Sequence, residues 1–395
     1  MPQGIGRIGA ADELLVHQSA NTFDVVGQSD HGWTEKIWAS MGRKDGSLQV
    51  DFGIGKYPNR DVIDGFAGAA RARSQWTVRA SRELGSDPGT VGVGPLRYEI
   101  VEPLRKVRLV LEPNDIQPVA FDLVFEGTLP AFFEDRDLGI ERGRVVTDVV
   151  RWHQGGTVSG IIQLEGEEHG VRPEEWFAFR DRSWGVRQYV GVAPTDLPPA
   201  DRDAFMARLH MQWCPLLLRR PDGSHYEMHY YFRDSGPKRT HYTGHINEAD
   251  GTQIRILDVR ANIKFAEHNR GIVGGEIVAV LDDADRSTRV FHVYPIGATG
   301  FRLNPALYFG WKDMYHGTWK GPAHQDGEFI ADCETEVDAL VNPVWQLRDR
   351  LVNVTEGDAS GFGILESMLI GDWPDLIVPM NERPTAAKEL NRAQS

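Results

Sequence analysis

Short segments in which apolar and polar residues alternate recur along the whole sequence of 395 residues. This alternation has the two-residue period of a half-buried β-strand. Turn sequences such as Pro221-Asp222-Gly223 separate the segments, and the 42 glycines and 22 prolines are spread along the chain. The sequence therefore predicts an all-β protein with many short strands. Clear alternating segments lie at residues 47–53, 96–101, 107–111, 120–126, 226–232, 253–259 and 289–294.

A proline-rich stretch near the middle of the chain, at residues 190–200, has little periodicity and the composition of a linker. A chain of this length exceeds what one hydrophobic core usually organises, so we expect two domains. We predict an N-terminal β domain over residues 1–190, a C-terminal β domain over 200–375 and a tail over 376–395. Each half could close its own antiparallel sheet, which favours two packed β-barrels over one large sandwich.

Composition sets aside several classes of function. The 57 acidic and 43 basic side chains give a net charge of −14, and no basic block suits nucleic acid. No apolar run is long enough for a membrane span, and we expect a cytoplasmic protein. The two cysteines, Cys214 and Cys333, are too few for a disulfide framework. A glycine-rich phosphate loop and a Gly-x-Ser-x-Gly motif are both missing, so we expect no nucleotide cofactor.

The segment from Glu175 to Arg187 is unusually dense in arginine, tryptophan and phenylalanine. In an extended strand, Asp181 would share an aromatic-rich face with Phe177, Phe179 and Ser183, while the residues between them would point to the other side. Burial would raise the pKa of Asp181, whereas a nearby arginine would lower it. Asp181 is therefore either a proton donor or a structural carboxylate paired with an arginine, and the sequence leaves both open.

Residues 180–187, Arg-Asp-Arg-Ser-Trp-Gly-Val-Arg, resemble a motif of the lipocalin-like superfamily that contains the carotenoid 1,2-hydratases and AttH-like proteins. The resemblance extends to residues 33–35, 52–58, 311–327 and 361–366. It implies two lipocalin-like β-barrel or sandwich domains packed together, with a pocket near their junction. It also implies hydration, cyclisation or isomerisation of hydrophobic isoprenoid or polyketide-like ligands without a redox cofactor.

Such chemistry needs a neutral carboxylic acid to protonate carbon, and aromatic faces to stabilise a carbocation. We therefore predict a lyase or isomerase (a hydratase, dehydratase or cyclase) that needs no cofactor and acts by acid catalysis on a hydrophobic terpenoid, steroid or lipid-like substrate. The catalytic candidates are Asp181, His316 and His210. We expect the cavity to be lined from both sides of the linker. The candidate substrate-binding residues are Trp184, Arg187, Trp213, Tyr231, Trp311 and Tyr315.

Two other functions fit the same residues: a non-catalytic carrier of a hydrophobic ligand, and, with less support, a glycoside hydrolase. His225, Glu227 and His229 share one face of a predicted strand, and two histidines with a carboxylate are possible metal ligands. The outer two lie about 13 Å apart along a strand at about 3.3 Å per residue, too far for one ion bound at about 2.1 Å. We therefore expect no metal site from this trio.

Overall fold

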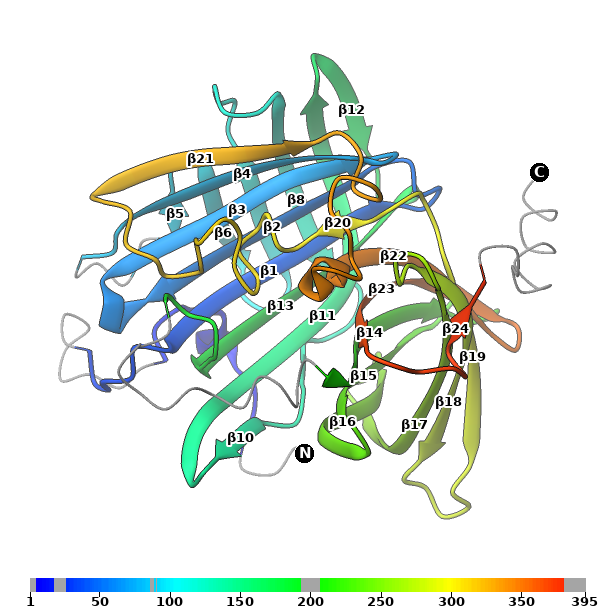
Figure 1. Ribbon diagram of the computed structural model, residues 1–395. Coiled ribbons are helices and arrows are strands. Elements are labelled where there is room, and N and C mark those ends of the chain that lie inside the picture. The colour runs from blue at the N-terminus through cyan, green and yellow to red at the C-terminus, as the bar shows by residue number, and fades with distance from the viewer. Residues whose placement is uncertain (1–4, 18–25, 86–88, 90, 193–206, 380–395) are drawn as a thin grey trace.

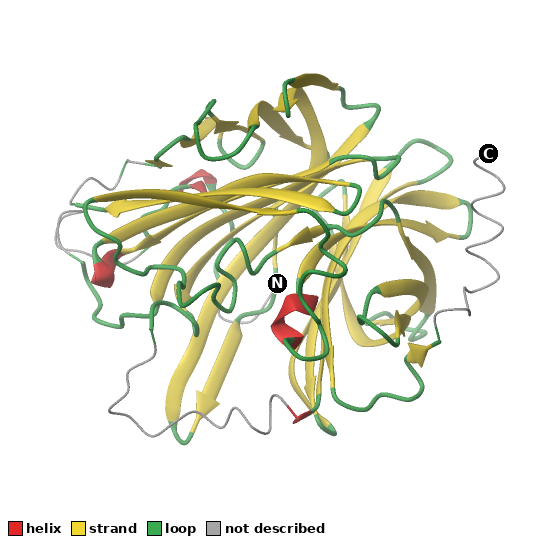
Figure 2. Cartoon of the chain, turned by 45° about the horizontal axis from the view of Figure 1, so that its top comes forward, coloured by secondary structure: helices red, strands yellow, loops and turns green. Residues whose placement is uncertain are grey.

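The computed structural model of the chain describes residues 5–17, 26–85, 89, 91–192 and 207–379. Regular structure within these residues is almost entirely β-strand, which confirms the all-β prediction (Figure 2). None of the described helices has the length and apolar character that a membrane span requires. The helical elements described in full are three short 3₁₀ turns, η1 (Ala10–Glu13), η2 (Pro58–Arg60) and η3 (Pro343–Gln346).

Fourteen strands of the described residues form the first sheet (Figure 1). Their bounds are β1 (Trp33–Arg43), β2 (Gln49–Tyr57), β3 (Val62–Arg71), β4 (Ser74–Glu83), β5 (Gly92–Val93), β6 (Leu96–Glu102), β7 (Lys106–Leu111), β8 (Val119–Gly127), β9 (Phe132–Phe133), β10 (Asp137–Glu141), β11 (Arg144–Leu164), β12 (Glu167–Val171), β13 (Trp176–Val186) and β21 (Ala323–Ile330). Their order across the sheet is β21-β4-β3-β2-β1-β13-β11-β8-β7-β6-β5, while β9, β10 and β12 pair with β11. The sheet curls, so that β5 and β6 lie against β3 around an apolar core.

Ten strands of the described residues form the second sheet. Their bounds are β14 (Leu209–Arg219), β15 (His225–Ser235), β16 (Lys238–Glu248), β17 (Gln253–Ala266), β18 (Ile272–Leu281), β19 (Thr288–Pro295), β20 (Phe301–Arg302), β22 (Arg348–Glu356), β23 (Ala359–Ile370) and β24 (Ile377–Val378). Their order is β16-β15-β14-β23-β22-β19-β18-β17-β24, and β20 pairs with β22. Because β16 also pairs with β17, this sheet closes into a barrel around its own apolar core.

A third apolar cluster fills the junction between the first sheet and the barrel. Phe177 and Phe179 of β13 contribute from the first sheet, and Met211 and Trp213 of β14 contribute from the second. Trp38 of β1 meets Trp213 edge to face, with ring centroids 5.2 Å apart. The two sheets are therefore packed together through aromatic and aliphatic side chains, as expected for two β units in contact.

One strand from the second half of the sequence belongs to the first sheet. β21 pairs antiparallel with β4, with Phe329 opposite Trp76 and Gly327 opposite Val78, and forms the edge of the sheet (Figure 1). The chain then returns to the barrel through η3 and β22. The predicted division near residues 190–200 falls largely outside the described residues and stays a prediction. The first sheet is nevertheless completed by residues 323–330.

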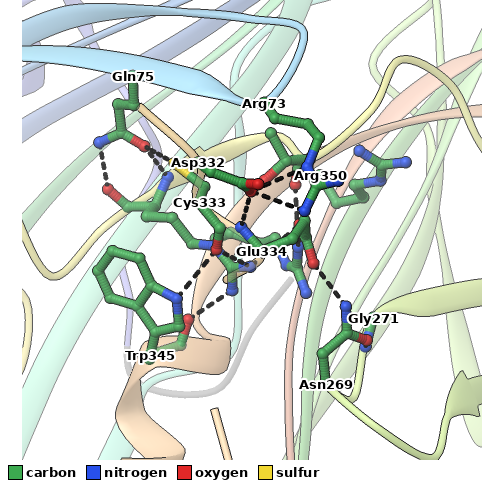
Figure 3. A network of polar contacts seen from close by, with 12 residues as sticks. Arg73, Gln75, Asn269, Gly271, Asp332, Cys333, Glu334, Trp345 and Arg350 are labelled. Carbon is green, nitrogen blue, oxygen red and sulfur yellow. Dashed lines mark hydrogen bonds and ion pairs between the residues drawn. The ribbon is translucent and has the colours of Figure 1, made fainter. Parts of the chain in front are cut away.

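A network of polar contacts stabilises the segment in which the chain turns back from β21 (Figure 3). Glu334 Oε1 accepts hydrogen bonds from Arg302 Nη2 at 3.1 Å and Arg348 Nη1 at 2.7 Å. Its Oε2 accepts a hydrogen bond from Asn269 Nδ2 at 2.6 Å. Burial alone would raise the pKa of Glu334, but Arg348 and Arg302 lower it to about 2. One carboxylate thus connects the returning segment with β20, β22 and the turn after β17.

We expect Glu334→Gln to lower the free energy of unfolding at neutral pH, because two arginines would lose their counter-charge. The pKa of Glu334 falls from an ordinary value of 4.5 to about 2 on folding. Its contribution to stability is therefore full above pH 4.5 and is lost as the pH falls toward 2. Denaturant titrations of variant and wild type should differ most near neutral pH and converge in acid. Glu276→Gln, at an exposed position of β18, is the control. A loss of unfolding free energy that is the same near neutral pH and in acid would contradict this account.

Candidate active site between the two sheets

A cavity with two adjoining chambers lies at the junction of the two sheets. The inner chamber has a volume of about 70 Å³ and the outer chamber about 170 Å³. The first sheet contributes side chains from β1, β11 and β13, and the second contributes side chains from β14, β15 and β23. The cavity is therefore lined by residues that precede the predicted linker in the sequence and by residues that follow it. Six residues line both chambers: Lys36, Arg151, Arg187, Met211, Tyr231 and Tyr308.

Strand β13 sends alternate side chains into two different interiors. Asp181 and Ser183 line the inner chamber. Arg180 points into the interior of the first sheet, where it donates to both carboxylate oxygens of Glu13 at 2.7 and 3.0 Å. Arg182 on the same face is also buried and forms an ion pair within that sheet. The alternation predicted for this strand is thus confirmed, and it directs Asp181 toward the cavity.

The carboxyl group of Asp181 lies on the wall of the inner chamber with 14% of its side chain exposed. Its Oδ2 lies 3.3 Å from Arg151 Nε. Burial raises the pKa of Asp181 above its usual range, although Arg151 and Arg187 act in the opposite direction. The sequence left open whether burial or a nearby arginine determines the pKa of Asp181, and burial has the larger effect. Asp181 therefore holds a proton at higher pH than an exposed aspartate does.

Lys36 of β1 brings an amine to both chambers. Only 6% of the residue is exposed, and its Nζ lies 4.3 Å from the centroid of the Tyr308 ring. Burial lowers the pKa of Lys36 to about 7; Arg187 acts in the same direction, and Asp64 and Asp181 oppose the shift. An amine with this pKa can accept or donate a proton near neutral pH.

A cluster of three carboxyl groups reaches the inner chamber through Glu366 of β23. Glu366 hydrogen-bonds to Asp349 of β22, which hydrogen-bonds to Asp51 of β2. Trp38 Nε1 donates to Asp349 Oδ2 at 2.9 Å. Burial raises the pKa of Asp51 to about 7, and burial next to another carboxyl raises those of Asp349 and Glu366 well above their usual range. The cluster therefore retains protons at neutral pH, and Glu366 brings it to the cavity.

Five of the nine site residues predicted from the sequence line this cavity. Asp181, Arg187, Trp213 and Tyr231 line the inner chamber, and His316 lines the outer one. His316 Nδ1 lies 3.4 Å from the carboxylate of an aspartate in β3. Burial lowers the pKa of His316 to about 4, so its ring is neutral at pH 7. These positions agree with a role at the cavity, while the role of each residue stays a prediction.

The other four predicted site residues are not part of the lining of either chamber. His210 packs among aromatic rings inside the barrel, because it lies on the face of β14 opposite Trp213. Trp184 lies on the face of β13 opposite Asp181 and stacks on a histidine at 3.6 Å between ring centroids. Trp311 stacks on another tryptophan at 5.5 Å, and Tyr315 lines a separate small cavity. Strand alternation accounts for the positions of the first two.

Sequence reasoning missed several residues of the cavity. Glu366 had a visible signal, since it is an acidic residue within the otherwise mostly apolar run at residues 364–370. Lys36, Arg151 and Tyr308 had no such signal in the sequence, because their contacts come from distant parts of the chain. Trp38 was also missed, although it lines the inner chamber and donates to the carboxyl cluster. These residues change the expected cavity from mainly aromatic to aromatic and strongly charged.

Comparison with solved structures identifies the fold of the chain that forms this cavity. A putative AttH from Nitrosomonas europaea is 12% identical with a TM-score of 0.50, over 85% of this chain and 92% of that one. CghA is also 12% identical with a TM-score of 0.50, over 88% and 91% of the two chains. Kievitone hydratase from Nectria haematococca has 12% identity and a TM-score of 0.46, over 94% and 98%. The two structures with a TM-score of 0.50 confirm the AttH-like fold predicted from residues 180–187.

A family model matches most of the sequence. No curated protein matches the chain. The model of a family of unknown function, DUF8625, matches residues 8–375 and so covers the first sheet, the cavity and the barrel. The chain therefore belongs to the family of unknown function DUF8625, with the fold of AttH-like proteins.

Proposed function

We propose that the protein is a lyase or isomerase of the hydratase, dehydratase or cyclase type that needs no cofactor and acts by acid catalysis. The observation that carries this proposal is the presence of two carboxyl groups, Asp181 and Glu366, in one chamber with aromatic walls. Burial raises the pKa of both groups. Each can therefore keep its proton at higher pH than an exposed carboxyl does and give it to a carbon–carbon double bond.

Aromatic side chains around the inner chamber suit the cation that such a protonation creates. Trp38, Trp213 and Tyr231 line this chamber together with the two acids. The faces of aromatic rings carry negative charge density and attract a cation within about 6 Å. The chamber thus combines a proton source with a surface that stabilises positive charge.

Lys36 supplies the base that completes the reaction. In a hydration, the proton of the acid forms a bond to one alkene carbon, and the oxygen of water forms a bond to the other. The water then loses a proton to the neutral amine of Lys36, whose pKa is about 7. In an isomerisation, the amine removes a proton from a carbon next to the cation instead. One proton is given and one is taken, so the acid and the amine return to their starting states by exchange with solvent.

The substrate class that we propose is a hydrophobic terpenoid, steroid or related lipid-like molecule with a polar end. Arg151 and Arg187 line both chambers and can hold an oxygen of that polar end. The outer chamber adds apolar surface from Met211 and Phe309, against which a hydrocarbon part can lie. The chambers of about 70 and 170 Å³ favour the smaller members of this class.

We expect Asp181→Asn or Glu366→Gln to lower turnover by at least about 10²-fold with little change in ligand affinity, because the amide keeps the shape but cannot donate the acidic proton. A panel of isoprenoid and polyketide-like alkenes and alcohols, incubated in D₂O and analysed by mass spectrometry, would identify a substrate through deuterium bound to carbon. Turnover and melting temperature of each variant are then measured with that substrate. Asp148→Asn is the matched control, since this carboxylate of β11 pairs with Arg136 and does not line the cavity.

Two results would overturn the proposed function. Near-normal turnover in correctly folded Asp181→Asn and Glu366→Gln would remove acid catalysis by these groups. Tight binding of panel members without conversion by the wild-type protein would favour a non-catalytic carrier.

We expect Lys36→Met to abolish turnover and to stabilise the fold at low pH. The pKa of Lys36 falls from 10.5 to about 7 on folding, so between these values the unfolded chain binds more protons than the folded one. Below pH 7 the folded protein carries a buried ammonium, which methionine would avoid. The gain should therefore be largest below pH 7 and shrink as the pH rises toward 10.5, as measured by denaturant titration. Lys106→Met, at a partly exposed ion pair, should show no such trend. A stability difference that does not depend on pH would contradict the shifted pKa.

A further inference from the structure

A cluster of histidine and glutamate side chains lies behind the wall of the inner chamber. Glu134 follows β9 and His153 belongs to β11, both on the side of the first sheet. Glu227 and His229 of β15 belong to the barrel. All four are at most 2% exposed, and none lines either chamber. The cluster is therefore a feature of the junction that the proposed reaction does not use.

Three of these side chains place donor atoms at distances that suit one metal ion. His153 Nδ1 lies 3.5 Å from Glu134 Oε1, and His229 Nε2 lies 3.4 Å from the same oxygen. Ligand atoms of a tetrahedral zinc ion with bonds of about 2.1 Å lie about 3.4 Å apart. The candidate ligand atoms of the three residues all lie within 4.8 Å of one another. Two imidazoles and one carboxylate are a donor set found in zinc sites.

Unpartnered polar atoms are the second observation. His153 Nδ1, both ring nitrogens of His229, Glu227 Oε2 and the Nδ1 of nearby His245 are buried and form no hydrogen bond. Buried polar groups in folded proteins are nearly always paired, and a cluster of exceptions calls for an ion or water. A proton on His153 would not account for all of these atoms, because both ring nitrogens of His229 would still have no partner.

The surroundings of the cluster are those of a metal site. His153 Nε2 lies 2.6 Å from Glu227 Oε1, which leaves Nδ1 free to bind an ion. Histidine ligands commonly donate their other nitrogen to a carboxylate in this way. Glu134 is held at both oxygens, by Trp213 Nε1 at 2.9 Å and by Arg151 Nη1 at 3.1 Å. The neighbouring side chains thus fix the orientation of both His153 and the carboxylate of Glu134.

We propose that Glu134, His153 and His229 bind a divalent transition-metal ion, for which zinc is the best match to the donors. The rings of His153 and His229 are stacked with centroids 4.0 Å apart, so binding requires the His229 ring to turn about its Cβ–Cγ bond. This turn breaks no hydrogen bond, because neither nitrogen of His229 has a partner.

The site would be structural, because its ligands are buried and lie outside the two chambers. Two ligands come from the side of the first sheet and one from the barrel, so the ion would fasten the two sheets together. Binding of an ion to the folded chain adds to the free energy of unfolding. The site supplies no group to the proposed reaction, and its test needs no substrate.

The test is metal analysis of the full chain, purified without a histidine tag and, in a second preparation, refolded with excess Zn²⁺ or Co²⁺ and then dialysed. We expect about one ion per chain, ligand-field absorption bands from Co²⁺, and a melting temperature that rises with the ion. Glu134→Gln and His229→Gln should bind less than about a tenth of an equivalent. His225→Gln is the matched control, because His225 begins the same strand, is only partly buried and lies outside the cluster.

Two outcomes would overturn the proposal. The first is wild-type protein that holds no ion in either preparation and melts at the same temperature with and without Zn²⁺. The second is an ion that stays bound at full occupancy in both Glu134→Gln and His229→Gln. The wild-type measurement decides the matter even where a variant does not fold.

Discussion

Strand β13 has no side that faces solvent along most of its length, and the rest of the structure depends on this constraint. It pairs with β1 on one edge and with β11 on the other. One face closes the interior of the first sheet, and the other packs on the barrel. Every side chain of this strand must therefore suit one of two interiors. Arg180 satisfies this condition by pairing with Glu13, whereas Asp181 satisfies it by facing a cavity with Arg151 in reach.

Arg151 connects the features of the junction electrostatically. Its Nε lies 3.3 Å from Asp181 Oδ2, and its Nη1 donates to Glu134 Oε2 at 3.1 Å. One guanidinium is thus shared between a carboxyl in the cavity and a carboxylate behind the wall. A change in the charge on Glu134 would alter how strongly Arg151 holds Asp181, and with it the pKa of Asp181. The cavity and the His–Glu cluster are therefore separate sites that share one cation.

The sequence predicts those parts of the site that local periodicity determines. The two-residue alternation placed Asp181 on one face of its strand together with Phe177 and Phe179, and it placed Trp184 on the opposite face, away from the cavity. Periodicity carries no information about which strands meet across two sheets. Lys36, Arg151 and Tyr308 could therefore not be assigned to one cavity.

The histidines illustrate the same limit. Periodicity groups His229 with His225 and Glu227 of its own strand, but the carboxylate beside its ring belongs to Glu134, which lies 95 positions earlier in the sequence. Fold class, in contrast, follows from many strands that each carry the same signal, so errors in single strands matter little. A site depends on a few side chains, and each of these is fixed by contacts between distant segments.

Because β21 pairs with β4, the first sheet can be completed only late in the synthesis of the chain. β4 ends at residue 83 and β21 begins at residue 323, so a ribosome adds about 240 residues between them. At about 5–20 residues per second, the edge of β4 waits roughly 10–50 s for its partner. An unpaired strand edge readily pairs with another chain. A nascent chain of this protein would thus need a chaperone, or a temporary cover from its own segments, until residues 323–330 emerge.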